Sequence, residues 1–233
     1  MNRWRWILCA VALNACLYAA FLWLDFTQIG SPASTWLKYA GILLCAAITF
    51  LARGRELSRG DLRLLQAALL LTVLADTSLL LLNQPVAGVA VFCAVQALHT
   101  TRFNGRSLKN PPKVLLFAFP IAILLYYLLD SLGMMFNPQF SVTLLYAPLL
   151  LISVASAIIA ALRCKFPLIN AVFMALGMVL FLLCDVNVAL YNSLAASMPR
   201  ISNAALPQIW LYYLPSQVLL ALSGIQFKTN QAL

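Results

Sequence analysis

Charged residues are scarce in this sequence of 233 residues, and acidic residues and histidine are the scarcest of them. Only 9% of the residues are charged, with six acidic residues and one histidine, whereas 64% are apolar or aromatic. The mean hydropathy is +0.93. A soluble domain carries roughly 25% charged residues, and a soluble chain of this length could not bury so much apolar surface. The composition excludes a soluble enzyme, a disordered chain and a nucleic-acid-binding domain, and it indicates a polytopic membrane protein with short loops.

The cysteines lack the patterns that are typical of disulfide scaffolds and metal sites. The six are Cys9, Cys16, Cys45, Cys93, Cys164 and Cys184, and no two of them form a CxxC pair. All but Cys164 lie inside apolar runs, which predicts that they pack as small buried hydrophobic side chains. We therefore expect neither a disulfide framework nor a metal site.

Eight long apolar runs follow one another along the chain. They cover residues 6–24, 36–52, 64–82, 86–103, 113–129, 141–162, 167–191 and 206–226. A helical span needs about 20 residues, whereas barrel strands have about ten residues in strict alternation. The runs predict an all-α membrane protein with about eight transmembrane helices, forming one integral membrane domain over residues 1–233. The first run has a basic start like that of a signal peptide, but its length favours a retained span.

Basic residues are distributed very unevenly between the two sides that these runs define. One side carries thirteen of them, namely Arg3, Arg5, Arg53, Arg55, Arg59, Arg63, Arg102, Arg106, Lys109, Lys113, Arg163, Lys165 and Lys228. The other side carries only Lys38 and Arg200. Loops rich in Lys and Arg stay in the cytoplasm, so both termini are predicted to be cytoplasmic. The minimal loops favour a bacterial inner membrane.

Two aspartates lie inside apolar runs at matching positions. Asp76 and Asp185 each stand six residues before the outer end of a run, about 9 Å deep at 1.5 Å per residue. Because ionisable groups at this depth are costly, each is a functional candidate. The two segments are four runs apart and look alike, which is consistent with a parallel four-plus-four internal repeat. A purely structural role, as a hydrogen-bonding partner between helices, is the alternative.

Other polar side chains in or beside the runs are weaker candidates. These are Lys38, His99, Tyr212, Tyr213 and Gln217. Lys38 could neutralise an aspartate or extend to the membrane interface, His99 could be a packing residue, and the two tyrosines could belong to an interfacial aromatic belt. We assign no role to Asp25, Asp130, Glu56 or Asp61, which lie at run ends or in a loop.

Five short elements occur in the same order as in a known family of small membrane proteins. They are Lys38 in WLKYAG, Leu74-Ala75-Asp76, Phe92 with His99 and Phe103, Asn170 to Phe173 with Phe181 to Asp185, and Tyr212 to Gln217. In these elements the chain resembles the YhhN-like lysoplasmalogenase family of eight-span proteins. The family has Gly where Ala75 stands and Ser where Cys184 stands, and its last element is one residue shorter, so the chain resembles a divergent member.

The resemblance implies hydrolysis of the vinyl-ether bond of lysoplasmalogens to a fatty aldehyde and glycerophosphoethanolamine or glycerophosphocholine. Such cleavage begins by protonating the alkenyl carbon, and water captures the resulting oxocarbenium-like cation. Paired carboxyl groups divide comparable work in glycoside hydrolysis, which makes Asp76 and Asp185 the candidate catalytic residues, with the acid unassigned. Lys38 or His99 could hold the phosphate or adjust one aspartate, with Tyr212, Tyr213 and Gln217 as further substrate-binding candidates. No cofactor or nucleic acid is expected.

Two other classes of function fit parts of the pattern. Matched acidic residues and a parallel repeat would suit a proton-coupled transporter or a lipid flippase. Against this, the runs lack paired Gly or Pro interruptions, and only the last run has a central proline. A non-catalytic membrane partner protein would not need two matched aspartates.

Overall fold

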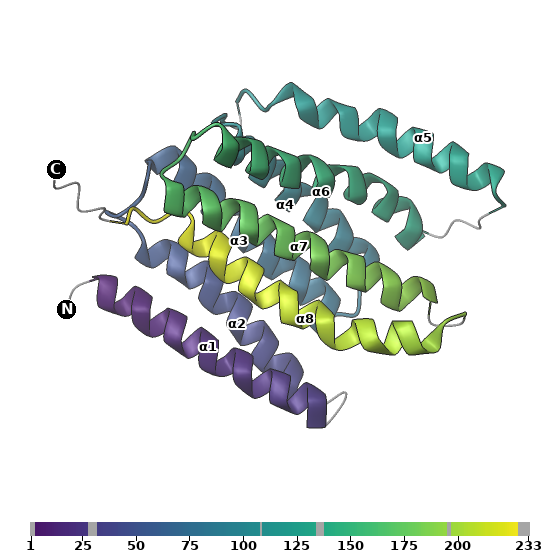
Figure 1. The fold of residues 1–233 in the computed structure, drawn as a ribbon, viewed down its shortest axis with the longest axis horizontal. Helices are drawn as coiled ribbons and strands as arrows, with labels where there is room; N and C mark the ends of the chain where they lie inside the picture. Colours follow the sequence, from purple (N-terminus) through teal and green to yellow (C-terminus); the bar gives the residue numbers. More distant parts are fainter. Residues whose placement is uncertain (1–2, 28–31, 108, 134–137, 195–196, 228–233) are drawn as a thin grey trace.

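The chain folds into a bundle of α-helices that lie side by side along one common direction (Figure 1). A computed structural model describes residues 3–27, 32–107, 109–133, 138–194 and 197–227. The helices are α1 (Arg3–Thr27), α2 (Pro32–Leu51), α3 (Arg59–Asp76), α4 (Pro85–Phe103), α5 (Ala118–Ser131), α6 (Pro138–Leu162), α7 (Leu168–Leu194) and α8 (Pro199–Leu222). A π-helix, η1 (Thr77–Leu81), extends α3, and a 3₁₀-helix, η2 (Lys113–Phe117), precedes α5. No strand occurs within these described ranges, so the all-α prediction is confirmed for them.

Within the described part of the chain, seven helical segments are long and apolar enough to cross a membrane. They are α1, α2, α3 with η1, α4, η2 with α5, α6 and α7. These segments mark the chain as an integral, multi-pass membrane protein. The helix α8 is not among the seven, although eight spans were predicted. It carries Asn203, Gln208, Ser216 and Gln217, and it starts at Pro199 rather than near 206 because proline suits the first turn of a helix.

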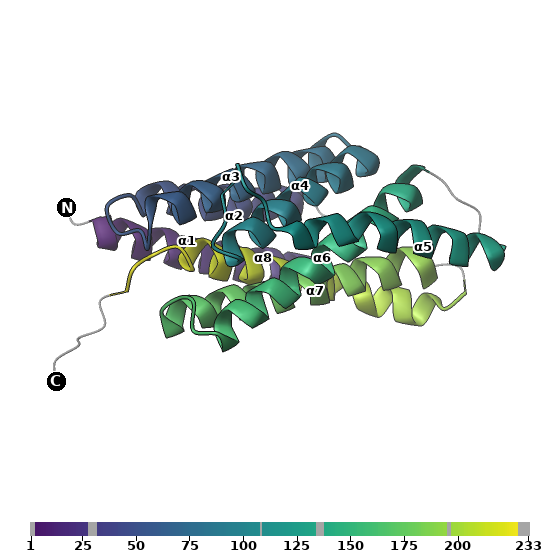
Figure 2. The ribbon, with the colours of Figure 1, turned by 90° about the horizontal axis from the view of Figure 1, so that it is seen from above.

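The helix α8 places several polar side chains, namely Ser202, Ser216 and Gln217, among its buried residues. It packs against α7 and also contacts α1, α2 and α3. Figure 2 shows α3 and α7 on opposite sides of α8. Polar side chains that face neighbouring helices are shielded from lipid, so a helix can carry them at membrane depth. The start of α1 and the end of α8 lie at the same end of the bundle (Figures 1 and 2).

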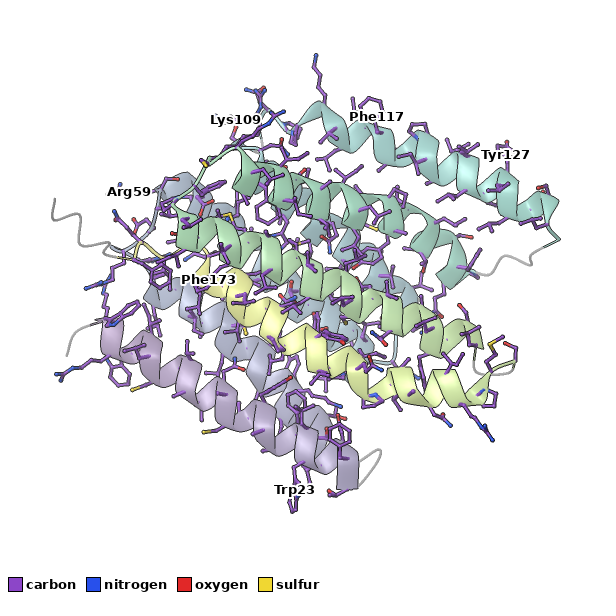
Figure 3. All side chains as sticks on the ribbon, viewed as in Figure 1. Trp23, Arg59, Lys109, Phe117, Tyr127 and Phe173 are labelled. Carbon is purple, nitrogen blue, oxygen red and sulfur yellow. The ribbon has the colours of Figure 1, made fainter. Side chains whose placement is uncertain are left out.

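The two peripheral helices, α1 and α5, expose many large apolar side chains. In α5 only Ala118 is buried, and Trp23 and Tyr127 point outward from α1 and α5 (Figure 3). Such a surface would be a liability in water, but in a bilayer it faces lipid. The expectation that the cysteines inside apolar runs are buried is wrong for Cys9 and Cys16, because both lie on the outward surface of α1. Cys45 and Cys184 are buried as expected.

A proline in α8 helps to attach α1 to the bundle. Pro215 has no N–H, so the carbonyl of Leu211 loses its helical donor. The hydroxyl of Tyr18 donates to this carbonyl at 2.9 Å, and the amide of Asn14 donates to the carbonyl of Gly41 in α2 at 2.9 Å. Because α1 has few buried side chains, these two hydrogen bonds supply part of its attachment to the bundle.

The end of the bundle at which α3 and α8 meet is closed by a buried ion pair. Arg102 donates from Nε to Oδ1 of Asp61 at 2.8 Å and from Nη2 to Oδ2 at 3.0 Å. It also donates from Nη1 to Oγ of Ser223 at 2.8 Å. The expectation that Asp61 is a loop residue without a role is wrong. It stands in the first turn of α3, where Ser58 caps the helix and the positive end of the helix dipole favours an acid.

The segment that follows α8 is held against this same end of the bundle. Its backbone pairs with the loop between α2 and α3, because Leu57 N donates to the carbonyl of Gly224 at 3.3 Å and Gln226 N donates to that of Arg55 at 2.6 Å. The amide of Asn170 in α7 donates to the carbonyl of Ile225 at 2.7 Å. The segment therefore joins α2, α7 and α8.

Replacing Gly88 by alanine is expected to lower the stability of the α3–α4 pair. A Cβ at this position would lie 2.6 Å from Cγ of Leu79 and 3.2 Å from the carbonyl of Ala75. Overpacking of this kind costs about 1–3 kcal/mol, against a gain in helix propensity of up to about 1 kcal/mol. Unfolding followed by circular dichroism in detergent measures the difference. Gly60→Ala is the matched control, because its Cβ would meet nothing within 4 Å; equal stability of both variants would contradict the prediction.

Candidate active site

Asp76 lies at the end of α3 and is almost completely buried, with 3% of its surface exposed. The hydroxyl of Tyr213 in α8 donates to its Oδ2 at 2.8 Å. The sequence singled out both residues, and the structure brings them together. A buried carboxyl group needs such a partner, because burying an unpaired polar group is costly.

The backbone changes its winding directly after Asp76. The π-helix η1 begins at Thr77, so that Leu82 N donates to the carbonyl of Thr77 at 3.1 Å. Single π turns are rare and often occur at functional sites. The hydroxyl of Thr77 lies 2.9 Å from that of Tyr39 in α2, which ties the widened turn to the next helix.

Asp185 stands in α7 and is partly buried. The hydroxyl of Tyr146 in α6 donates to its Oδ2 in a short hydrogen bond. Tyr146 in turn accepts a hydrogen bond of 3.4 Å from Nε2 of Gln96 in α4. Oγ of Ser153 donates to Oε1 of the same glutamine at 2.6 Å. Asp185 is therefore the end of a polar chain that joins α4, α6 and α7.

One aromatic ring lies next to both of the tyrosines that donate to the aspartates. The centroid of Phe92 is 6.4 Å from that of Tyr213 and 6.2 Å from that of Tyr146. The two aspartates, the two tyrosines and Phe92 form what we call the carboxyl pair site. It has two carboxyl groups, two hydroxyl groups and an apolar wall.

Lys38 lies near this site but is paired with a different acid. Its Nζ lies 2.8 Å from Oδ2 of Asp25, and Ser34 donates to the same carboxylate. The ammonium also lies over the ring of Trp210, at 5.2 Å from the centroid, and the Trp210 ring is 5.2 Å from that of Tyr213. The expectation that Asp25 has no role is therefore wrong, because Asp25 positions Lys38.

The other candidates from the sequence make no hydrogen bond with Asp76 or Asp185 among the described residues. The ring of His99 is fully buried and stacks on Phe103 at 5.5 Å. Neither of its nitrogens has a hydrogen-bonding partner among the described residues. Gln217 is buried and donates to Oγ of its neighbour Ser216 at 3.2 Å. Tyr212 is partly exposed, and only Tyr213 of the tyrosine pair reaches an aspartate.

Tyr146 belongs to the carboxyl pair site and Ser153 to the polar chain behind it, and neither was predicted. A weak signal exists in the sequence, because the two polar residues are seven positions apart in the apolar run of α6 and so share one helical face. By the same spacing argument Gln96 and His99, three positions apart in α4, share one helical face. Which face of each helix meets which other helix is decided by tertiary packing, and no periodicity reveals it.

The profile of the YhhN family matches residues 33–224. The chain belongs to the YhhN family. The match covers all the residues of the carboxyl pair site and also Lys38, which agrees with the family resemblance of the sequence elements. Comparison with curated proteins finds no match. Comparison with solved structures finds none either.

Proposed function

We propose that this YhhN family member is a membrane-embedded hydrolase that cleaves the vinyl-ether bond of lysoplasmalogen-type lysophospholipids. The products would be a fatty aldehyde and glycerophosphoethanolamine or glycerophosphocholine. The observation that carries the proposal is the carboxyl pair site, in which Asp76 and Asp185 each accept a hydrogen bond from a tyrosine beside Phe92. Family membership supports the same activity.

The proposed reaction consumes one water and forms no covalent enzyme intermediate. One carboxyl group of the pair protonates the alkenyl carbon, which leaves positive charge shared between the ether oxygen and its carbon. The other group, as a carboxylate, stabilises this cation and accepts a proton from the attacking water. The hemiacetal then breaks down to the aldehyde and the free hydroxyl of the glycerol. Two acids in unlike surroundings suit this division, as in glycoside hydrolysis.

The surroundings of the pair suit a lipid substrate. The rings of Phe92 and Phe181, 5.8 Å apart, offer an apolar wall for the alkenyl chain. Lys38, Asp25 and Trp210 lie on the side of Tyr213, where the polar head would lie near the interface. Lys38 contacts an aromatic ring next to the pair site, and we propose that it attracts the substrate phosphate. His99, Tyr212 and Gln217 are not assigned a step.

We further propose that the chain spans a bacterial inner membrane eight times, with α8 as the eighth span and both termini in the cytoplasm. The distribution of Lys and Arg supports this orientation. A four-plus-four repeat is supported by one correspondence between the halves. Tyr39 of α2 bonds Thr77 next to Asp76, and Tyr146 of α6 bonds Asp185 itself.

Aldehyde release is the measurement that tests the proposed function. We expect the purified protein in detergent or nanodiscs to release fatty aldehyde from a lysoplasmalogen and to leave the saturated ether analogue intact. The analogue lacks the double bond whose carbon takes the proton. If correctly folded protein releases no aldehyde, or cleaves both lipids equally, the proposed function is wrong.

A further inference from the structure

The loop between α4 and α5 forms a basic pocket at one end of the bundle. The pocket has a volume of about 510 Å³, and its lining includes Arg106, Lys109 and Lys113. It lies outside the carboxyl pair site, and nothing in the proposed reaction uses it. Figure 3 shows Lys109 at the end of the bundle where Arg59 also lies, which is the cytoplasmic end in the proposed orientation.

The walls of this pocket are held in place by hydrogen bonds and prolines. The helix α4 ends in a Schellman motif, with Gly105 N donating to the carbonyl of Arg102 at 2.9 Å and Arg106 N donating to that of Thr101 at 3.0 Å. Gly105 has the positive φ of 65° that this motif requires. Asn104 donates from Nδ2 to Oγ of Ser156 at 3.1 Å, which fixes the pocket wall to α6. Two prolines, 111 and 112, stiffen the opposite wall.

The three cations of this pocket have no acidic partner within the described residues. The nearby acid Asp61 is fully engaged by Arg102. Asp25 is paired with Lys38, and Glu56 accepts a hydrogen bond from the backbone of Gly54. Three positive charges around one cavity therefore lack compensation from the protein, and a phosphate-bearing anion would supply it.

The surroundings of the pocket favour a lipid phosphate over a free one. The loop continues directly into η2, whose Leu116 and Phe117 are 67% and 62% exposed. Figure 3 shows Phe117 at the end of α5 nearest to Lys109. Basic side chains beside an apolar, lipid-facing helix match an anionic phospholipid, with its headgroup among the cations and its chains along α5.

We propose that the pocket lined by Arg106, Lys109 and Lys113 binds the phosphate-bearing headgroup of an anionic phospholipid. The ligand is a structural lipid of the leaflet on that side. The site is separate from the carboxyl pair and independent of the proposed hydrolase activity.

Native mass spectrometry of the purified full chain, titrated with phosphatidylglycerol, tests this site. We expect saturable binding that is much tighter than that of phosphatidylcholine. The variant R106Q/K109Q/K113Q should bind phosphatidylglycerol about 100-fold more weakly, since each basic residue near anionic lipid contributes about 1 kcal/mol, or about fivefold. The control R5Q/R163Q/K165Q loses the same charge from exposed positions and should bind like the wild type.

Three outcomes would overturn the proposal. The first is equal weakening in both triple variants, because binding would then follow total charge. The second is equal binding of both lipids by the wild type. The third is complete displacement of the lipid by an equal concentration of inorganic phosphate, which would show a site for free phosphate. If the triple variant does not fold, the single variants K109Q and K113Q carry the test, each with an expected weakening of about fivefold.

Discussion

Asp76→Asn is expected to reduce aldehyde release by about 10²–10⁴-fold, the usual contribution of a positioned general acid or base. The amide keeps the size of the side chain and can still accept the hydrogen bond of 2.8 Å from Tyr213, so the helix packing should survive. It can neither deliver a proton nor carry the negative charge that stabilises a cation. Asp185→Asn removes the same two properties on α7 and should cause a loss of similar size.

The double variant distinguishes a catalytic pair from two independent sites. Residues that act as a unit are strongly non-additive, so D76N/D185N should be little worse than either single variant. Asp130→Asn is the matched control, because Asp130 is exposed at the end of α5 and should leave the rate unchanged. Initial rates of aldehyde formation, with size-exclusion profiles as the folding check, supply the comparison. Near wild-type activity in both folded single variants would show that the aspartates are structural.

Much of this site could be predicted because membrane depth makes polar residues conspicuous. Asp76 and Asp185 stood out from apolar runs, and their equal distance from the run ends predicted a shared depth. Their tyrosine partners, Tyr213 and Tyr146, both lie next to the ring of Phe92. The partner tyrosines were harder to predict, because Tyr213 and Tyr212 are neighbours in sequence and only helix rotation decides which one faces Asp76.

The errors concern charged residues close to the ends of the helices. Asp25 and Asp61 were assigned no role, because they stand at a run end and in a loop, yet each forms an ion pair with a basic residue from another helix. Sequence position gives the depth of such a residue but not its neighbours across the bundle. The polar residues of α8 have the same origin, since which of them face other helices is a property of the assembled fold.

Arg102→Leu is expected to destabilise the bundle more than any other single substitution outside the carboxyl pair site. Its side chain is fully buried, and that of Asp61 is 8% exposed. Removing the arginine leaves a buried carboxylate without its bidentate partner and Ser223 without its donor. Breaking a buried pair from one side costs about 3–5 kcal/mol. Unfolding by graded denaturant in mixed micelles should show this loss, and Arg163→Leu, on an exposed residue outside the basic pocket, should change stability by at most about 0.5 kcal/mol.

Replacing both Arg102 and Asp61 separates two effects: the cost of leaving one buried charge unpaired, and the net contribution of the ion pair to stability. The attraction within a buried ion pair does little more than offset the desolvation of its two charges. R102L/D61L should therefore recover most of the stability that R102L loses. The recovery would mean that the pair fixes how α3, α4 and α8 meet rather than supplying net stability. If the double variant is as unstable as the single one, the hydrogen bonds of Arg102 to Asp61 and Ser223 themselves stabilise this end of the bundle.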